Sequence, residues 1–359
     1  MTRTPRTKSF AGAAVALLLT SAALTACSPS DKSSGSSSGS DSADVKATTL
    51  SLVSYSVPKA AYDVAQVDFA KTAAGKGVSF ETSYGASGDQ SRAVESGKEA
   101  DYVNFSLEPD VTRLVKAGIV AEDWNKGATK GIVSKSVVVL VVRKGNPKNI
   151  TGWDDIVKPG IEIVTPNPGS SGSAKWNILA AWAHATTTGS DDDGKAFISK
   201  LFANAVTLAA SGREATTAFS GGTGDVLLSY ENEAIFARQS GEDFDYVIPD
   251  ITLQIENPAA VTKTANAKAQ DFLDYLLSDA GQKAFVSKGF RPAVDSVEVG
   301  EVEGANDPKD PFPAPKDKLV TIAELGGWSD VNKKFFATKE KDGADGIITT
   351  IQNASGKGN

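Results

Sequence analysis

The sequence predicts an α/β protein with mainly parallel sheets and two lobes. Strand patterns and helix patterns alternate along most of the chain, which is typical of parallel sheets flanked by helices. At 359 residues the chain is long for one hydrophobic core, so two lobes of ordinary size are expected. Small hydroxylated residues recur between a strand and the following helix, where ligands of such sheets bind. These turns are therefore expected to face one cleft.

The first 47 residues are predicted to be an export signal followed by a tether. Residues 1–26 join three basic residues to a short apolar run, as export signals do, and the run is short for a membrane span. Leu24-Thr25-Ala26-Cys27 resembles the bacterial lipobox, so lipidation of Cys27 and anchoring to the outer face of the cytoplasmic membrane are expected; a free or buried thiol is the alternative. Residues 27–47, rich in Ser, Gly and Asp, are predicted to be flexible.

From Thr48 onward the chain repeats strand–turn–helix units. Predicted strands are 48–55, 78–84, 101–105, 136–143, 161–164, 206–209 and 225–230, with extended segments at 246–248 and 261–262. Predicted helices are 59–73, 91–97, 108–117, 153–157, one ending near 186, 195–203, one after 211–216, 231–235, 267–277, 280–288, 319–325 and 329–338. The polar stretch 188–194 is predicted to be a solvated loop.

Catalytic and metal sites find little support in the sequence. A serine nucleophile such as Ser171 needs a base within reach, and the single histidine, His184, lies in an apolar helical run. The acidic run 191–193 lacks the spacing of a calcium loop, and there is no Gly-x4-Gly-Lys-Ser/Thr phosphate loop. Lys plus Arg number 37 against 44 Asp plus Glu, which argues against a nucleic-acid surface. No catalytic residue, metal or cofactor is expected.

With catalytic and metal sites unsupported, the candidate site consists of uncharged hydrogen-bond donors. The strand 161–164 runs into a Pro/Asn/Gly turn, then into small residues and a helix, and a helix N-terminus of this kind binds anions because its first N–H groups lack partners. Ser171 or a neighbour can cap that helix. Similar donors stand at other strand ends, although each alone could be an ordinary cap or turn. The candidate residues are Ser56, Ser87, Ser171, Gly172, Ser173, Gly212 and Tyr230.

Several segments, which together span about 48–328, are distinctive: 53–55, 85–90, 142–148, 165–177, 212–213, 224–227, 231–233 and 290–292. Together they resemble the sulfate-binding proteins of bacterial ABC uptake systems, including their thiosulfate-binding relatives. The Asn-Pro and Trp-Asn segment, 165–177, is long and specific. The resemblance implies a type II periplasmic-binding-protein fold, in which each of two lobes has a mostly parallel sheet flanked by helices and the ligand cleft lies between them. The implied division is 48–138 and 248–353 for lobe 1, 139–247 for lobe 2 and 354–359 for a tail.

The resemblance also implies a sulfate held without charged side chains in direct contact. Carried over, the donors are the backbone N–H groups of Ser56, Ser87, Gly172, Ser173 and Gly212 and the hydroxyl of Ser171. Tyr230 stands where sulfate binders have a tryptophan, so it either donates to the anion or leaves room for thiosulfate. Arg213, beside Gly212, is either a charge behind the donors or part of an ion pair.

The implied function is a non-enzymatic, lipid-anchored, monomeric receptor that delivers sulfate to a membrane permease with a separate ATPase. Thiosulfate or another tetrahedral oxyanion is the alternative ligand. A secreted serine hydrolase and a surface interaction protein without a ligand are alternatives of other classes.

Overall fold

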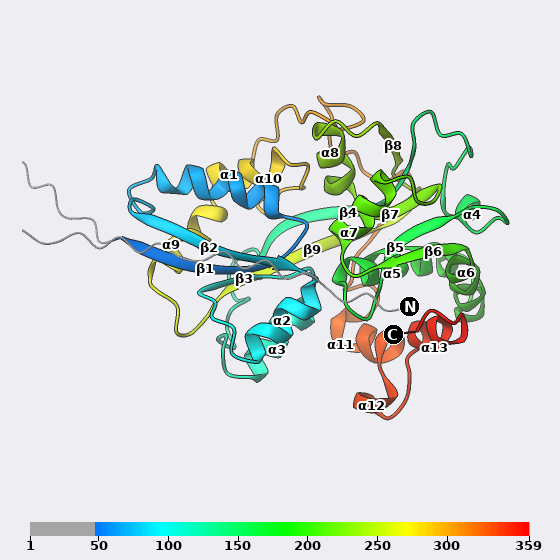
Figure 1. Ribbon diagram of the computed structural model, residues 1–359, viewed down its shortest axis with the longest axis horizontal. Helices are drawn as coiled ribbons and strands as arrows, with labels where there is room; N and C mark the ends of the chain where they lie inside the picture. The colour runs from blue at the N-terminus through cyan, green and yellow to red at the C-terminus, as the bar shows by residue number, and fades with distance from the viewer. Residues whose placement is uncertain (1–46, 359) are drawn as a thin grey trace, which may run out of the picture. The chain divides into compact units, whose positions relative to one another are not determined.

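The computed structural model describes residues 47–358, and these form ten strands with helices around them (Figure 1). The predicted export signal, Cys27 and all but the last residue of the predicted tether lie outside the described residues. The strands are β1 (Thr48–Tyr55), β2 (Val78–Gly85), β3 (Tyr102–Asn104), β4 (Ile132–Arg143), β5 (Ile163–Pro166), β6 (Ala205–Ala209), β7 (Val226–Tyr230), β8 (Phe244–Val247), β9 (Ile251–Val261) and β10 (Lys318–Val320).

The helices lie between these strands and in the C-terminal segment. They are α1 (Lys59–Ala70), α2 (Ser87–Glu95), α3 (Glu108–Lys116), α4 (Trp153–Ile156), α5 (Gly172–Thr187), α6 (Asp191–Asn204), α7 (Gly212–Ser220), α8 (Glu231–Gln239), α9 (Lys268–Leu276), α10 (Asp279–Val286), α11 (Gly327–Val331), the π-helix η1 (Asn332–Phe336), α12 (Lys339–Asp342) and α13 (Ile347–Ala354). Among the described residues, no helix has the length and apolar character needed to span a membrane.

The strands follow the order β2-β1-β3-β9-β4-β7-β5-β6. β1 pairs in parallel with β2 and β3, and β5 pairs in parallel with β6 and β7. We call the first group with α1–α3, α9 and α10 the β1–β3 lobe, and the second group with α4–α8 the β5–β7 lobe (Figure 1). The predicted two-lobed α/β architecture is confirmed.

The two central strands of this order, β9 and β4, connect the sheet of one lobe to the sheet of the other. Their antiparallel pairing runs from Ile132 opposite Pro258 to Val137 opposite Gln254. Beyond it, β9 pairs with β3 and β4 pairs with β7. The valine-rich centre of β4 is buried on both faces, as its continuous apolar pattern predicts.

The C-terminal segment packs on helices of the β5–β7 lobe. The indole of Trp328 on α11 meets that of Trp176 on α5 edge to face, with ring centroids 4.7 Å apart. Phe335 of η1 packs similarly against Trp182, and the Lys357 ammonium donates to the carbonyl of Phe202 on α6. The predicted division at 138, 247 and 353 stays a prediction.

Several predicted elements were wrong in position or type. The loop predicted over 188–194 is wrong in its second part, because α6 already begins at Asp191: the Asp193 carboxylate accepts from the Ser190 N–H, and the Ser190 hydroxyl accepts from the Asp193 N–H, as in a capping box. The helix predicted over 319–325 begins instead as β10, which pairs with β9. Most of β9 and the whole of α13 were not predicted.

Candidate functional site

A small, tight pocket lies where four chain turns meet between the lobes. The ends of β1 and β2 with the start of α2 come from the β1–β3 lobe, and the starts of α5 and α7 come from the β5–β7 lobe. Its lining consists of Tyr55, Ser56, Gly85, Ala86, Ser87, Ser171, Gly172, Ser173, Ser211 and Gly212. Six of the seven predicted ligand-binding residues are therefore brought together, and Tyr230 is the exception.

Three helices begin at this pocket. Ser87, Gly172 and Gly212 are the first residues of α2, α5 and α7, and Ser173 is the second residue of α5. First-turn N–H groups have no acceptor within their own helix, and they stand at the positive end of the helix dipole. No lining residue carries a formally charged side chain. The pocket therefore presents neutral donors that converge from both lobes, an arrangement suited to an anion.

The two serines at N-cap positions differ in what their hydroxyls do. The Ser211 hydroxyl accepts from the Glu214 N–H at 3.2 Å and so caps α7. Ser171 precedes α5 in extended conformation, but its side chain makes no capping hydrogen bond. Part of the sequence prediction was therefore wrong, because Ser171 occupies the cap position without capping by its hydroxyl. Ser171 is nevertheless one of the residues that line the pocket.

The Ser87 hydroxyl is occupied by hydrogen bonds within the protein, one of them to the buried carboxylate of Asp110. It donates to the Asp110 carboxylate at 2.6 Å and accepts from the Ser106 N–H at 2.9 Å. Burial raises the pKa of Asp110, while the hydrogen bond from Ser87 and the nearby charge of Lys175 oppose that rise. With its hydroxyl engaged in this way, the backbone N–H is the donor that Ser87 retains at the pocket; its role in binding a ligand stays a prediction.

Glycine at two lining positions permits close approach of the lobes. A Cβ on Gly172 would lie 2.6 Å from the Ser106 hydroxyl and 2.8 Å from Leu107 Cγ. A Cβ on Gly212 would lie 2.8 Å from the Ser173 hydroxyl and 3.2 Å from a methyl of Val57. Ser106, Leu107 and Val57 belong to the β1–β3 lobe, whereas both glycines belong to the β5–β7 lobe. The lobes can therefore lie this close together only because these two positions carry no Cβ atom.

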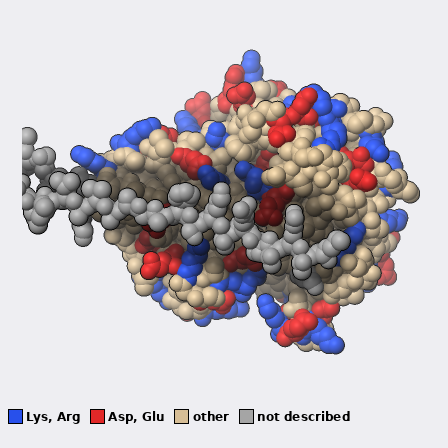
Figure 2. All heavy atoms as spheres, viewed as in Figure 1, with Lys and Arg blue, Asp and Glu red and all other residues tan. Residues whose placement is uncertain are grey.

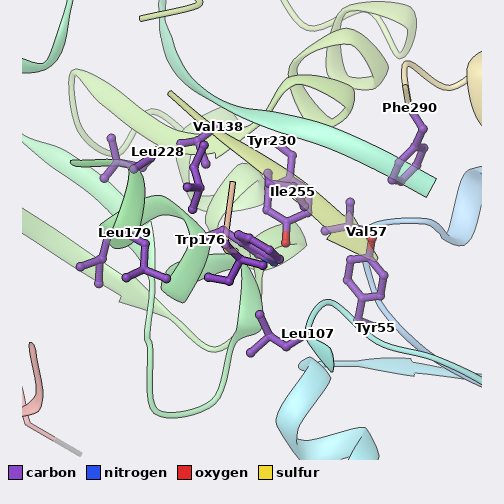
Figure 3. Close-up of a cluster of buried hydrophobic side chains, with 14 of the residues drawn as sticks. Tyr55, Val57, Leu107, Val138, Trp176, Leu179, Leu228, Tyr230, Ile255 and Phe290 are labelled. Atoms are coloured by element: carbon purple, nitrogen blue, oxygen red, sulfur yellow. The ribbon is translucent and has the colours of Figure 1, made fainter. Parts of the chain in front are cut away.

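Tyr230 lies behind the pocket, at the end of β7, and is only 1 % exposed. Its hydroxyl shares a hydrogen bond of 2.7 Å with that of Ser106. Figure 3 shows its ring pointing toward Trp176 inside a buried cluster of apolar side chains. Burial raises the pKa of Tyr230, although hydrogen bonding with Ser106 and Ser173 opposes the rise, so the phenol stays neutral at physiological pH.

Arg213 is engaged in an ion pair. Its guanidinium donates to both carboxylate oxygens of Glu233, at 2.7 and 3.0 Å, and to the Val57 carbonyl at 3.0 Å. Burial acts to lower the pKa of Arg213, but the charge and hydrogen bonding of Glu233 outweigh it and raise the pKa. Because Val57 lies in the β1–β3 lobe, this side chain also connects the two lobes.

The geometry gives no support to a serine hydrolase site, to a metal site among the described residues or to anion binding in another hollow. His184 lies thirteen residues after Ser171 along α5, about 20 Å away, and its Nε2 is 3.1 Å from Asp154. It cannot serve Ser171 as a base. Among residues 47–358, no group of three metal-ligating side chains is found. A larger hollow beside Trp124 carries the carboxylates of Asp123 and Asp274, which would repel an anion.

The charged side chains of the surface are mixed in sign. Figure 2 shows Lys and Arg interspersed with Asp and Glu on the face in view. No field of one sign covers this face, so attraction of an anion would be local to the pocket.

The residues that sequence reasoning missed fall into two groups. Tyr55, Gly85, Ala86 and Ser211 line the pocket and are chain neighbours of predicted residues, so the strand–turn–helix pattern already pointed to them. Ser106, behind the pocket, follows the short strand β3, and nothing in the local pattern distinguishes it.

Comparisons with known proteins show the family to which the chain belongs. The model of a family described as bacterial extracellular solute-binding protein matches residues 50–291. A sulfate-binding protein of Synechococcus elongatus is 40% identical over 341 residues, covering 92% of this chain and 93% of the relative. A thiosulfate-binding protein of Pseudomonas aeruginosa is 35% identical over 287 residues, covering 77% and 84%. The solved structure of the sulfate-binding protein SubI from Mycobacterium tuberculosis shares 47% identity with a TM-score of 0.75, covering 81% of this chain and 100% of that one.

Proposed function

Because the chain belongs to the family of bacterial extracellular solute-binding proteins, we propose that it captures sulfate for an ABC importer. The relatives named above are binding proteins, and a binding role without catalysis fits a pocket in which no histidine reaches a serine. Export from the cytoplasm accords with the description of the family. Lipidation of Cys27, action as a monomer and delivery to a permease with a separate ATPase are further parts of the proposal.

The observation that carries the proposal is the neutral, donor-rich lining. Sulfate is fully ionised near neutral pH and offers only acceptors, which N–H and O–H donors match. Protonated phosphate brings a hydrogen that needs an acceptor, and the nearby Asp110 carboxylate already accepts from Ser87. Leaving that hydrogen unpaired in a buried site costs about 1–3 kcal/mol. The pocket is therefore suited to sulfate over phosphate.

We propose that the donors are the N–H groups of Ser56, Ser87, Gly172, Ser173 and Gly212 and the hydroxyl of Ser171. They come from both lobes, so a bound anion contacts both and favours the closed arrangement. Arg213 contributes by pairing with Glu233 rather than by touching the anion.

Calorimetric titration of the exported chain with sulfate, thiosulfate, phosphate and molybdate tests this proposal. Tight binding of sulfate is expected, with phosphate weaker by about 5- to 150-fold, the equivalent of the penalty above. Thiosulfate as the tightest ligand would change the substrate but keep the receptor. Binding of none of the four would refute the receptor, and ester hydrolysis abolished in Ser171→Ala would replace it with a hydrolase.

Ser171→Ala also tests the assignment of donors. It removes the one side-chain donor proposed and should weaken sulfate binding, whereas Ser211→Ala removes a hydroxyl that is occupied in capping α7. The Ser211 variant should chiefly lower thermal stability. Equal effects of the two variants on sulfate affinity would contradict the assignment.

A further inference from the structure

Ser106 joins the two lobes directly behind the pocket. It is fully buried between β3 and α3, in the β1–β3 lobe. Its carbonyl accepts from the Trp176 indole N–H at 2.9 Å, and its hydroxyl shares the 2.7 Å hydrogen bond with Tyr230. Trp176 and Tyr230 both belong to the β5–β7 lobe. A single residue thus makes two hydrogen bonds across the boundary between the lobes.

The same residue is connected to the pocket lining. The Ser106 N–H donates to the Ser87 hydroxyl at 2.9 Å, which places Ser106 directly behind the first residue of α2. On the other side, the missing Cβ of Gly172 is what leaves room for the Ser106 hydroxyl. Ser106 therefore lies between the first residues of two helices, α2 and α5, one from each lobe, that supply N–H groups to the pocket.

Tyr230 is placed to act on Ser106 from behind the pocket, and its hydroxyl also lies near that of Ser173, a lining residue of its own lobe. Its ring is buried, it does not line the pocket, and its hydroxyl is already bonded to that of Ser106. If the lobes separate, Tyr230 and Trp176 move away from Ser106 together, and both hydrogen bonds are lost. The contact thus exists only while the lobes are together, so it stabilises the closed arrangement selectively.

We propose that Ser106 is a positioning residue that holds the lobes closed over the ligand, and that Tyr230 contributes to binding through Ser106. The inference rests on the proposed function, since it assigns a role within that anion site. A larger closed fraction raises the apparent affinity in proportion, because a ligand that contacts both lobes binds the closed form. Removing the hydroxyl of either partner should weaken binding without removing any donor from the pocket.

A double-mutant cycle of Ser106→Ala and Tyr230→Phe, read as the sulfate dissociation constant by calorimetry, tests this role. Each single change should raise the dissociation constant about 3- to 10-fold, as expected for one buried hydrogen bond. The double variant should bind sulfate about as weakly as the single variant that binds it less well, because the Ser106–Tyr230 bond is already lost in each single variant. Thr262→Val is a matched control: its hydroxyl donates to the Ala100 carbonyl within the β1–β3 lobe, at the opposite end of β3 from Ser106. That variant should lose thermal stability but keep its sulfate affinity.

The outcomes of this cycle distinguish a Tyr230 that acts through Ser106 from one that acts on the anion itself. Effects that multiply in the double variant would show that Tyr230 acts independently on the anion and would overturn the proposal, as would an unchanged affinity in Ser106→Ala. Small-angle scattering of the sulfate-free chain gives a second readout, in which Ser106→Ala and Tyr230→Phe should shift the protein toward a more open form. A wild-type chain that binds no sulfate would refute the proposed function alone, because the scattering comparison still decides the role of Ser106.

Discussion

Gly172→Ala adds a single methyl group at the boundary between the lobes. Gly172 is the first residue of α5, and the new Cβ would lie 2.6 Å from the Ser106 hydroxyl, 2.7 Å from Ser106 Cβ and 2.8 Å from Leu107 Cγ. These distances are shorter than real Cβ contacts, so something must move. Ser106 and Leu107 are buried and have little freedom to do so. The simplest relief is for the two lobes to move apart.

The expected magnitude follows from the cost of overpacking. One additional methyl group in a closely packed site costs about 1–3 kcal/mol. The cost arises only when the lobes are closed, so it should appear in ligand binding and much less in folding. Converted at about 1.4 kcal/mol per tenfold change, it predicts a rise in the sulfate dissociation constant of about 5- to 150-fold. The backbone N–H of residue 172 is retained, so no donor is lost.

Calorimetry with sulfate and urea unfolding of the ligand-free chain measure the two effects separately. Gly127→Ala is the control, because a Cβ at Gly127 meets nothing within 4 Å and its φ is not in the left-handed region. It should leave both quantities unchanged. A Gly172→Ala variant that folds normally and binds sulfate as tightly as the wild type would refute the argument that this glycine sets the spacing of the lobes.

Three further predictions concern stability. Arg213→Met leaves the Glu233 carboxylate, which is 2 % exposed, without its charged partner, so it should lower the free energy of unfolding in urea by about 3 kcal/mol. The double variant Arg213→Met/Glu233→Gln should regain part of this loss. Equal stability of the single and the double variant would contradict a buried ion pair. Trp328→Ala removes the ring packed on Trp176 and should cost about 3–5 kcal/mol by the same assay, and a loss below 1 kcal/mol would mean that the C-terminal segment contributes little. Burial lowers the pKa of Lys175 to about 8, so between about pH 8 and pH 10 the unfolded chain binds more protons than the folded one. The free energy of unfolding of the wild type should therefore rise with pH in this range. Lys175→Met should flatten this rise, and an unchanged slope in that variant would exclude the lysine as its source.

Local patterns were sufficient to predict most of the pocket. Ser56, Ser87, Ser171, Gly172 and Gly212 all lie where a strand pattern ends and a helix follows, a place that alternation and small residues mark in the sequence. The carboxyl ends of parallel strands meet at one edge of a sheet, so the approximate convergence of these turns also followed from the predicted architecture.

Contacts between distant segments could not be predicted in this way. Ser106 gains its role from Trp176 and Tyr230, which are far away in the sequence, and its own segment resembles many short strand-to-helix connections. The start of α6 was missed because three consecutive aspartates suggest a solvated loop, although the same carboxylates are favourable in the first turn of a helix. β9 was missed because its central Gln-Ile-Glu-Asn-Pro sequence has weak strand character, and pairing with β4 and β3 outweighs this local preference.

The pairing of β4 with β9 has a mechanical consequence. A ribbon of two hydrogen-bonded strands bends and twists at little cost, but lengthening it or sliding one strand past the other breaks the register from Ile132–Pro258 to Val137–Gln254. If the lobes move relative to each other, we expect a rotation about this ribbon, because a lateral displacement would break the register. Each closing movement should then return α2, α5 and α7 to the same mutual alignment. The proposed site, in which several neutral donors would meet one small ion, would benefit from this reproducibility more than a site built on a single strong charge.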